Sequence, residues 1–389
     1  MNKLYYLLFI LFFFSCKEKF TPAPEPPVAL PERTILVYLC GDNNLSSEID
    51  IKIDALHEGM KNIGKTDNHL IVYADYNDKM PKLVEIKADG ITLIEQYAEL
   101  NSASAVNFAN ILQKVFSKFS AKSYGLICFS HASGWLPKGA LNNPSGYNAA
   151  SYNSDNSLPV TQSIFEDNGQ EMSIAEFADA IQTEDGKLKF IIFETCYMAG
   201  VEVVYELRNK TEYIISSAAE MLSNGLADIY PDNLSDLFAP EPRLKTFAKA
   251  YFDYRNNMSG TSRSATISLI NTAKMDDLAA VVKTIYNNNA AFDIGNIQHF
   301  NRNQHHLFFD LSDFIEIIST NQQKADYEQI IFQIVEYQDA TPQFMRNYEY
   351  SFTINKHCGL TTYIKQALFP NLNAEYDNLN WGWYLVVGI

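Results

Sequence analysis

Two short segments of this chain contain the residue types needed to cleave an acyl bond. One is SHASGW (130–135), in which a histidine precedes small residues, and the other is ETCYM (194–198), which contains a cysteine. A free thiol has a pKa of about 8.5, so at neutral pH it needs a base such as imidazole to remove its proton. The two segments therefore indicate nucleophilic catalysis by Cys196, with His131 as acid and base.

The same segments contain candidates for stabilising a negatively charged intermediate. Backbone N–H groups in a tight turn can point at a developing oxyanion. The candidates are the N–H groups of Ala132, Ser133 and Gly134, together with that of Cys196. A structural interpretation is also open, because a cysteine that ends a buried strand is often a small core residue, and a histidine before a turn is often only hydrogen-bonded.

Both segments follow apolar runs that predict buried strands. These runs are 124–130 and 188–193, and similar runs occur at 34–40, 69–75 and 213–217. Apolar runs without alternation, separated by helical patterns, are typical of a parallel sheet covered on both faces. Ligands of such sheets bind beyond the carboxyl ends of the strands, so we expect His131 and Cys196 to meet at one edge. The helical patterns lie at 47–60, 104–119 and 173–182, the last with a capping box of Ser173 and Glu176.

The N-terminus has the features of an export signal. Residues 1–16 contain Lys3, an apolar stretch over 4–14, and then Ser15-Cys16. The apolar stretch is shorter than the roughly 20 residues that a membrane-spanning helix needs. Cys16 after a small residue resembles the lipobox of bacterial lipoproteins, which implies acylation of Cys16. The alternative is an ordinary signal peptide that is cleaved nearby. We therefore expect an exported protein, anchored at the outer membrane or cell surface, or held in the periplasm.

The rest of the chain divides into a tether and a folded body. Residues 17–32 are rich in proline and read as a semi-extended tether. We assign 33–240 to the α/β core and 241–389 to a C-terminal portion of helices and a few strands, at 266–270, 348–354 and 360–364. A hairpin is predicted at 83–87 and 91–96, and the long polar stretch between His131 and Ser173 is interpreted as a lid or a processing loop.

Composition excludes several classes of protein. The formal net charge of −16 and the lack of a Lys/Arg-rich stretch argue against nucleic-acid binding and favour a cationic substrate. Besides Cys16 there are four cysteines, whose spacing fits neither a disulfide framework nor a zinc ribbon. His305, His306 and His357 lack a His-Glu-x-x-His pattern, so no metal site is assigned.

HASGW (131–135) and ETCYM (194–198) resemble the paired motifs of the clostripain family of cysteine peptidases, relatives of caspases, gingipains and legumain. The resemblance extends to TILVYLCGDNNL (34–45), YIISSAAE (213–220) and FFDLSDF (308–314). It implies a caspase-like three-layer α/β/α sandwich with a mostly parallel central sheet and a helical C-terminal portion. It also implies an endopeptidase that cleaves proteins or peptides after Arg or Lys through a dyad of His131 and Cys196.

Two residues depart from the family pattern. Ala132 stands where the family usually has glycine, which keeps the N–H but narrows the dihedral angles open to the turn. Glu194 replaces an aspartate that in the family lies near the floor of the pocket for a basic P1 side chain. Glu194 is therefore our first candidate for binding Arg or Lys, and Glu220, Asp228 and Trp135 are further candidates for substrate binding.

The resemblance leaves several alternatives open. The departures at Ala132 and Glu194 permit a catalytically weak or inactive surface lipoprotein that binds peptide or glycan. The family also resembles zymogens that cut themselves near the active site, for which Lys138 is a candidate, although a solvated loop lysine is the simpler interpretation. No cofactor is assigned, and a calcium requirement stays open.

Overall fold

A computed structural model describes residues 29–147, 164–182, 186–222, 224–286 and 291–386. Contacts group Pro31–Ile389 into one compact unit, distinct from Met1–Leu30. The predicted signal, Cys16 and most of the tether lie outside the described residues. Among the described helices, none is long and apolar enough to cross a membrane.

The centre of the folded unit is a large twisted sheet. Within the described ranges it has nine strands in the order β12-β10-β9-β8-β5-β1-β2-β3-β4. Strands β9, β8, β5, β1 and β2 run parallel, and antiparallel strands flank them on both sides. The strands are β1 (Arg33–Gly41), β2 (His69–Tyr76), β3 (Lys82–Lys87), β4 (Gly90–Gln96), β5 (Ser123–Phe129), β8 (Leu188–Glu194), β9 (Thr211–Ser216), β10 (Thr266–Asn271) and β12 (Val335–Ala340).

The apolar runs of the sequence form the parallel strands. All of β1 is buried, and β5 and β8 are buried except near their N-terminal ends. Such strands bury both faces because helices cover both sides of a parallel sheet. The five predicted strands and the hairpin of β3 and β4 are thereby confirmed, with ends that differ by one or two residues.

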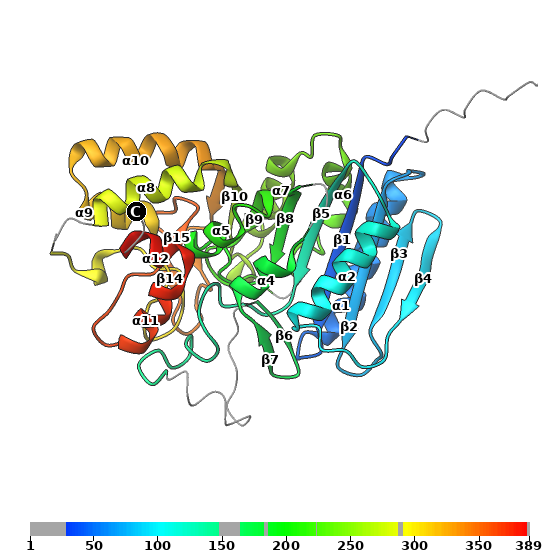
Figure 1. Cartoon of the computed structure of the whole chain (residues 1–389), viewed down its shortest axis with the longest axis horizontal. Coiled ribbons are helices and arrows are strands. Elements are labelled where there is room, and N and C mark those ends of the chain that lie inside the picture. The colour runs from blue at the N-terminus through cyan, green and yellow to red at the C-terminus, as the bar shows by residue number, and fades with distance from the viewer. Residues whose placement is uncertain (1–28, 148–163, 183–185, 223, 287–290, 387–389) are drawn as a thin grey trace, which may run out of the picture. The chain divides into compact units, whose positions relative to one another are not determined.

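Helices pack on both faces of the sheet and make two separate hydrophobic cores (Figure 1). One core includes side chains of α1 (Ser46–Ile63), α6 (Tyr230–Phe238) and α7 (Leu244–Asn256). The other includes side chains of α2 (Ala105–Lys118), α4 (Ile174–Ala180), α5 (Val201–Leu207) and α8 (Met275–Tyr286). This is the expected three-layer α/β/α arrangement. The capping box of Ser173 and Glu176 is present at α4.

The C-terminal portion contributes both helices and strands. Strands β10 and β12 extend the central sheet beyond β9, although the sequence did not predict β12. The predicted strands at 348–354 and 360–364 shrink to two residues each. The remaining elements are α9 (Leu311–Ile318), α10 (Asn321–Ile334), α11 (Pro370–Asn378), α12 (Asn380–Val386), β11 (Phe309–Asp310), β13 (Gln343–Phe344), β14 (Phe352–Thr353), β15 (Thr361–Thr362) and the 3₁₀ turns η1 (Gly260–Ser262), η2 (Thr272–Lys274) and η3 (Ile294–Asn296).

The described parts of the long polar stretch are ordered against the sheet edge. A hairpin of β6 (Ile164–Asp167) and β7 (Gln170–Met172) lies beside the end of β5, where Ile164 bridges to Ala132. Lys138 donates a hydrogen bond from Nζ to the carbonyl oxygen of Gly169 at 2.7 Å, so this lysine holds the hairpin. Residues 148–163 of the predicted loop lie outside the described residues.

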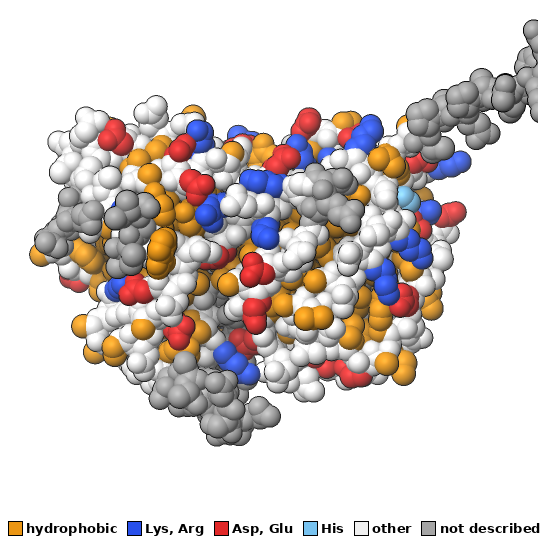
Figure 2. Space-filling model, viewed as in Figure 1, with side chains coloured by type: hydrophobic (Ala, Val, Ile, Leu, Met, Phe, Trp, Pro, Cys, Tyr) orange, Lys and Arg blue, Asp and Glu red, His pale blue; other side chains and the backbone are white. Residues whose placement is uncertain are grey.

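Charged side chains of both signs are interspersed over the face seen in Figure 2. Many charged side chains of the described residues form exposed ion pairs, such as Lys114 with Glu95 and Lys249 with Asp253. Pairs of this kind each contribute little to stability. The distribution on this face offers no broad basic surface of the kind that phosphate backbones require.

Candidate active site

His131 and Cys196 follow the ends of two neighbouring parallel strands. In the register of β5 and β8, Phe129 pairs with Glu194, the last residue of each strand. His131 and Cys196 each lie two residues beyond this last pair. The two side chains expected to share one edge of the sheet are therefore placed one strand apart at the same edge.

The turns that carry these two residues also contact each other. Gly134 has φ of +66°, and a Cβ atom at this position would lie 2.8 Å from the carbonyl oxygen of Tyr197. Only glycine fits both this backbone conformation and this close approach. The turn after His131 thus packs directly on the residue that follows Cys196.

Cys196 lies in a turn held by the segment after β9. The N–H of Tyr197 donates to the carbonyl oxygen of Ala219 at 3.0 Å, and that of Ala199 to Ser217 at 3.0 Å. The N–H of Met221 points at Sγ of Cys196, with the nitrogen 3.4 Å from the sulfur. The thiol is half-buried and unpaired with any other cysteine. The sulfur therefore has a fixed position and a backbone donor beside it.

The surroundings of Cys196 keep its thiol protonated. Burial raises the pKa of Cys196 to about 12, and the carboxylate of Glu220 adds to this rise. The N–H of Met221 and the guanidinium of Arg302 lower this pKa, but by less. A thiolate can then form only together with proton transfer to a base.

His131 is held by an asparagine from the loop after β1. Its Nε2 lies 2.5 Å from Oδ1 of Asn44. An amide oxygen only accepts hydrogen bonds, so this contact places the proton of a neutral imidazole on Nε2 and leaves Nδ1 free to accept one. Burial lowers the pKa of His131 below its ordinary value, which favours the neutral ring at pH 7. The ring is thus prepared to act as a base.

The predicted oxyanion residues lie in the same turn. Ala132 is buried and forms an isolated bridge with Ile164, and it is not among the described non-glycine residues with positive φ. Its methyl group therefore fits the turn without backbone strain. Ser133 is buried beside it, and Gly134 supplies the left-handed residue that the turn requires.

Glu194 is enclosed by contacts within the protein. Its Oε2 lies 2.5 Å from Nζ of Lys52 and accepts the N–H of Leu226 at 2.8 Å. Its Oε1 accepts the hydroxyl of Tyr230. The side chains of Lys52 and Glu194 are only 1% and 0% exposed. These contacts favour the role of a strand-end carboxylate paired within the protein over that of a substrate ligand.

A close approach of the backbone seals this buried pair. Gly225 has φ of +52°, and a Cβ atom there would lie 2.2 Å from Oε2 of Glu194 and 2.8 Å from Nζ of Lys52. Lys52 also donates to the carbonyl oxygen of Asn224 at 3.1 Å. The turn at 224–226 is therefore pinned over the Glu194–Lys52 pair.

The other substrate-binding candidates occupy different surroundings. Glu220 is part-exposed and binds Arg302 through both carboxylate oxygens. Asp228 is exposed, with Nδ2 of Asn224 3.4 Å from its carboxylate. Trp135 is 3% exposed and packs among the rings of Tyr363 and Tyr376, a position that favours a core role.

Sequence reasoning missed Asn44, Lys52 and Arg302. Asn44 could have been predicted as a site residue, because it lies in the turn after a strand whose carboxyl end faces the site. Lys52 gave a signal too, since it lies with Ile49, Ile53 and Leu56 on the buried side of α1 and thus required a buried acid. Nothing in the sequence pairs Arg302 with Glu220.

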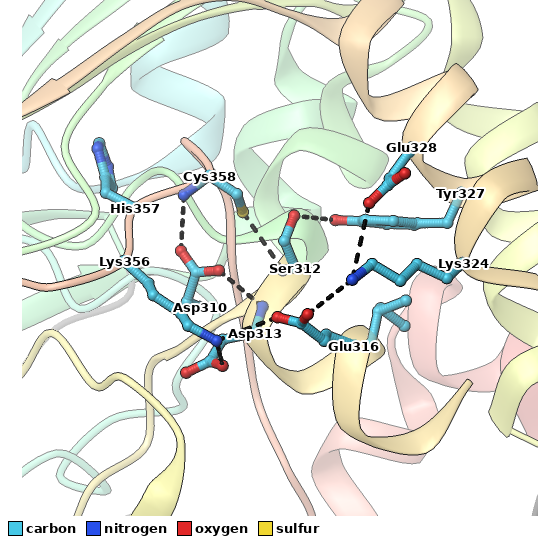
Figure 3. Close-up of a pocket in the computed structure, with 11 residues that line it drawn as sticks. Asp310, Ser312, Asp313, Glu316, Lys324, Tyr327, Glu328, Lys356, His357 and Cys358 are labelled. Atoms are coloured by element: carbon cyan, nitrogen blue, oxygen red, sulfur yellow. Dashed lines mark hydrogen bonds and ion pairs between the residues drawn. The ribbon is translucent and has the colours of Figure 1, made fainter. Parts of the chain in front are cut away.

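A cavity of about 320 Å³ lies apart from these residues, between α9, α10 and residues 356–358 (Figure 3). Asp310, the N-cap residue of α9, accepts the N–H of Asp313 at 2.9 Å and that of Cys358 at 2.7 Å. Lys356 binds Asp313 and Glu316 at the same place. Asp310 and its neighbours thus order the start of α9.

Over the described residues, no group of three or more His, Cys, Asp or Glu side chains is arranged to hold a metal ion. Cys40, Cys128, Cys196 and Cys358 are all free thiols.

Comparisons with known proteins agree with this geometry. The model of the Clostripain family matches residues 37–368. The structure of an inactive zymogen of a C11 protease from Parabacteroides distasonis is 29% identical, with a TM-score of 0.78, over 92% of this chain and 99% of that one. A secreted C11 cysteine protease from Bacteroides thetaiotaomicron, solved with an irreversible peptide inhibitor, is 25% identical, with a TM-score of 0.77, over 92% and 99%.

A further C11 protease of B. thetaiotaomicron, iotapain, shares the fold at 20% identity and a TM-score of 0.78, over 92% of this chain and 100% of that one. Comparison with curated protein sequences gave no match. The family match covers most of the chain, and the caspase-like α/β/α architecture is shared with these proteases. The chain belongs to the clostripain family and is a cysteine-type peptidase.

Proposed function

We propose that this protein is an exported endopeptidase in which Cys196 is the nucleophile and His131 the acid and base. The observation that carries the proposal is the register of β5 and β8, which brings both residues to one edge of the sheet on adjacent strands. The contact of Gly134 with the carbonyl of Tyr197 supports it, because the two turns pack on each other.

The mechanism follows from the protonation of the two side chains. Nδ1 of His131 takes the proton of the thiol as Sγ of Cys196 attacks the peptide carbonyl carbon, because a thiol with a raised pKa has little free thiolate. The imidazolium then protonates the leaving amine, and the C–N bond breaks to give a thioester. Water, deprotonated by His131, hydrolyses the thioester and releases the acid product.

Backbone donors complete the site in this proposal. The N–H groups of Ala132, Ser133, Gly134 and Cys196 are the candidates for holding the oxyanion. Asn44 adds an orienting contact to the dyad, since it fixes the tautomer of His131.

Cleavage after Arg or Lys, which the family resemblance implies, is the finer part of the proposal. The charge of −16 supports a cationic substrate. Glu194 is an unsuitable ligand for that cation, because Lys52, Tyr230 and Leu226 already use its oxygens. Glu220 and Asp228 are the remaining acids, and their part-exposed or exposed carboxylates support this role.

Export on a lipid anchor is proposed from the sequence alone. The basic start, short apolar stretch and Ser15-Cys16 support an acylated Cys16 followed by a proline-rich tether. The family includes a protease described as secreted. Mass spectrometry of the mature protein tests the anchor, because an acylated Cys16 would be its first residue.

A second candidate is a catalytically weak surface protein that binds peptide or glycan. The observation that favours it is the burial of the Cys196 thiol, which raises its pKa to about 12 and so opposes a reactive thiolate. A thiol-directed probe separates the two functions. The peptidase is labelled at Cys196 and protected by peptide substrate, whereas the binding protein is not labelled and keeps its affinity for peptide or glycan after Cys196→Ala.

The central experiment compares the mature protein with its Cys196→Ala variant on a library of peptides containing Arg or Lys. The variant should lose all cleavage. Equal cleavage by both proteins would overturn the proposal.

A further inference from the structure

The acids near the proposed nucleophile differ in whether a substrate could reach them. Glu194 and its partner Lys52 are 0% and 1% exposed, under the turn that contains Gly225. Removing one member of a buried pair leaves an uncompensated charge in the interior, which is strongly unfavourable. A substrate cation therefore cannot replace Lys52 at Glu194 without opening the protein.

Glu220 is paired with Arg302, a partner that a substrate cation can replace. Nε and Nη2 of Arg302 lie 2.5 Å and 2.9 Å from the two carboxylate oxygens of Glu220, in a two-pronged contact. Here the side chains are 21% and 27% exposed. Water can replace each partner as the pair separates, so exchange costs far less than at Glu194.

This exchangeable pair lies next to the thiol. Glu220 directly precedes Met221, whose N–H points at Sγ of Cys196 from 3.4 Å. The charges of Glu220 and Arg302 also act on the Cys196 thiol, and they do so in opposite directions. Among the candidate acids, Glu220 is thus the one beside the reacting atom.

Arg302 projects from an anchored turn, while its head group has weak additional contacts. The side chain of Asn301 fixes the turn by binding the carbonyl of His305 at 2.8 Å and the N–H of Leu307 at 3.0 Å. Beyond Glu220, the guanidinium contacts the carbonyl of Glu349 at 3.4 Å and lies 5.4 Å from the ring of Tyr348. The head group can therefore leave Glu220 while the backbone of the turn stays in place.

We propose that Glu220 is the acid that binds the basic side chain of the substrate, and that Arg302 occupies the place of that side chain at Glu220 in the free enzyme. A substrate Arg or Lys displaces Arg302 from Glu220, and the freed guanidinium moves into solvent. This inference rests on the proposed peptidase function and names the specificity residue of that same site. The pairing of Arg302 with Glu220 also supports a preference for Arg or Lys in the substrate, because the carboxylate of Glu220 accepts a guanidinium in two-pronged geometry.

The experiment measures kcat and KM with two peptides that are identical except for Arg or norleucine before the scissile bond. Arg302→Ala should lower KM for the arginine peptide about fivefold, the factor that corresponds to a part-exposed ion pair, and leave the norleucine peptide unchanged. Glu220→Gln should raise KM for the arginine peptide alone. Ethylguanidinium should inhibit Arg302→Ala more strongly than the unmodified enzyme.

Arg208→Ala is the matched control. Arg208 is also 21% exposed and forms a 2.7 Å pair with Asp276, but this pair joins the C-cap of α5 to α8 and does not involve Glu220. This variant should behave as the unmodified enzyme with both peptides. A higher KM of Arg302→Ala for the arginine peptide, or an equal change for both peptides, would overturn the inference.

Failure of catalysis is distinguished by a binding measurement. In the Cys196→Ala background, calorimetry with the same two peptides should show tighter binding of the arginine peptide after Arg302→Ala and weaker binding after Glu220→Gln. If the unmodified enzyme cleaves nothing and Cys196 is not labelled, the proposed function fails, while this binding series still decides the role of Arg302. Binding that is independent of both substitutions would reject the inference.

Discussion

Nε2 of His131 lies 2.5 Å from the side-chain oxygen of Asn44, in the loop that follows the first strand of the sheet. The contact joins two segments far apart in sequence and assigns the proton of the neutral imidazole to Nε2, which leaves Nδ1 free to accept a proton. Asn44 is in this view a positioning residue, since it acts on the reaction through His131.

The first prediction concerns this contact. Asn44→Ala should reduce kcat about 10- to 100-fold with little change in KM, because the ring loses its orientation and its preferred tautomer while substrate contacts remain. Steady-state kinetics with one peptide substrate measure both constants. Asn44→Asp should retain the contact and move the acid limb of the pH profile upward, since a carboxylate favours the imidazolium. A fall in kcat with an identical pH profile for both variants would point to a structural role.

The second prediction concerns the pH dependence of the unmodified enzyme. His131 must be neutral to accept the thiol proton, and burial lowers its pKa below the ordinary value of 6.5. Activity should therefore be lost only as the pH falls through a value below 6.5, and kcat/KM should be constant from there through neutral pH. An acid limb centred at pH 7 or above would contradict this assignment of the base.

The third prediction concerns the buried pair under the turn at 224–226. Lys52→Met should lower the free energy of unfolding by about 3–5 kcal/mol, because it leaves the carboxylate of Glu194 buried without its cation. Urea denaturation measures the change. Lys52→Met combined with Glu194→Gln should recover most of it, since glutamine is uncharged, its oxygen can accept the N–H of Leu226, and its NH2 group can donate to the hydroxyl oxygen of Tyr230. Additive losses in the double variant would show that the two side chains are not coupled.

The fourth prediction concerns Asp75, at the carboxyl end of β2. Asp75 is fully buried, accepts the hydroxyl of Ser102 at 2.5 Å, and has a second oxygen without a hydrogen-bond partner. Burial raises the pKa of Asp75 to about 8. The folded protein therefore keeps a proton that the unfolded chain releases near pH 4, and stability is lost as the pH rises from there toward 8.

Replacing this acid should remove that loss. Asp75→Asn should melt at a higher temperature than the unmodified protein at pH 9, and the difference should shrink toward pH 4. Calorimetry over this range measures it, with Asp67→Asn at an exposed position as the control. A difference that is the same at all pH values would mean that the titration of Asp75 does not contribute.

Patterns along the chain predicted the part of the fold that depends on burial. The runs at 124–130 and 188–193 are apolar because helices cover both faces of β5 and β8, so their position and end were visible in the sequence. β12 was missed because it is an edge strand with alternating polar residues, Val335–Ala340, in which no side chain is fully buried. The amino-acid composition of an edge strand is less distinctive than that of a buried strand.

The sequence predicted the candidate site only where the ends of predicted strands determine the position of a residue. The parallel register brings His131 and Cys196 to one edge, and this convergence needed only the two strands. The partners of the acids were not predictable, because Lys52 with Glu194 and Arg302 with Glu220 are pairs between segments far apart in sequence. An ion pair of this kind leaves no periodic signal, so the partners of Glu194 and Glu220 could not be inferred from their neighbours in sequence.

The pair of Glu194 and Lys52 beneath Gly225 differs from the pair of Glu220 and Arg302 in how easily it separates. The first pair cannot separate without opening the interior of the protein. The second pair needs only the movement of one part-exposed arginine head group. Cleavage preference could therefore be redesigned by substitutions at Arg302 with little loss of thermal stability, whereas substitutions at Lys52 would destabilise the fold.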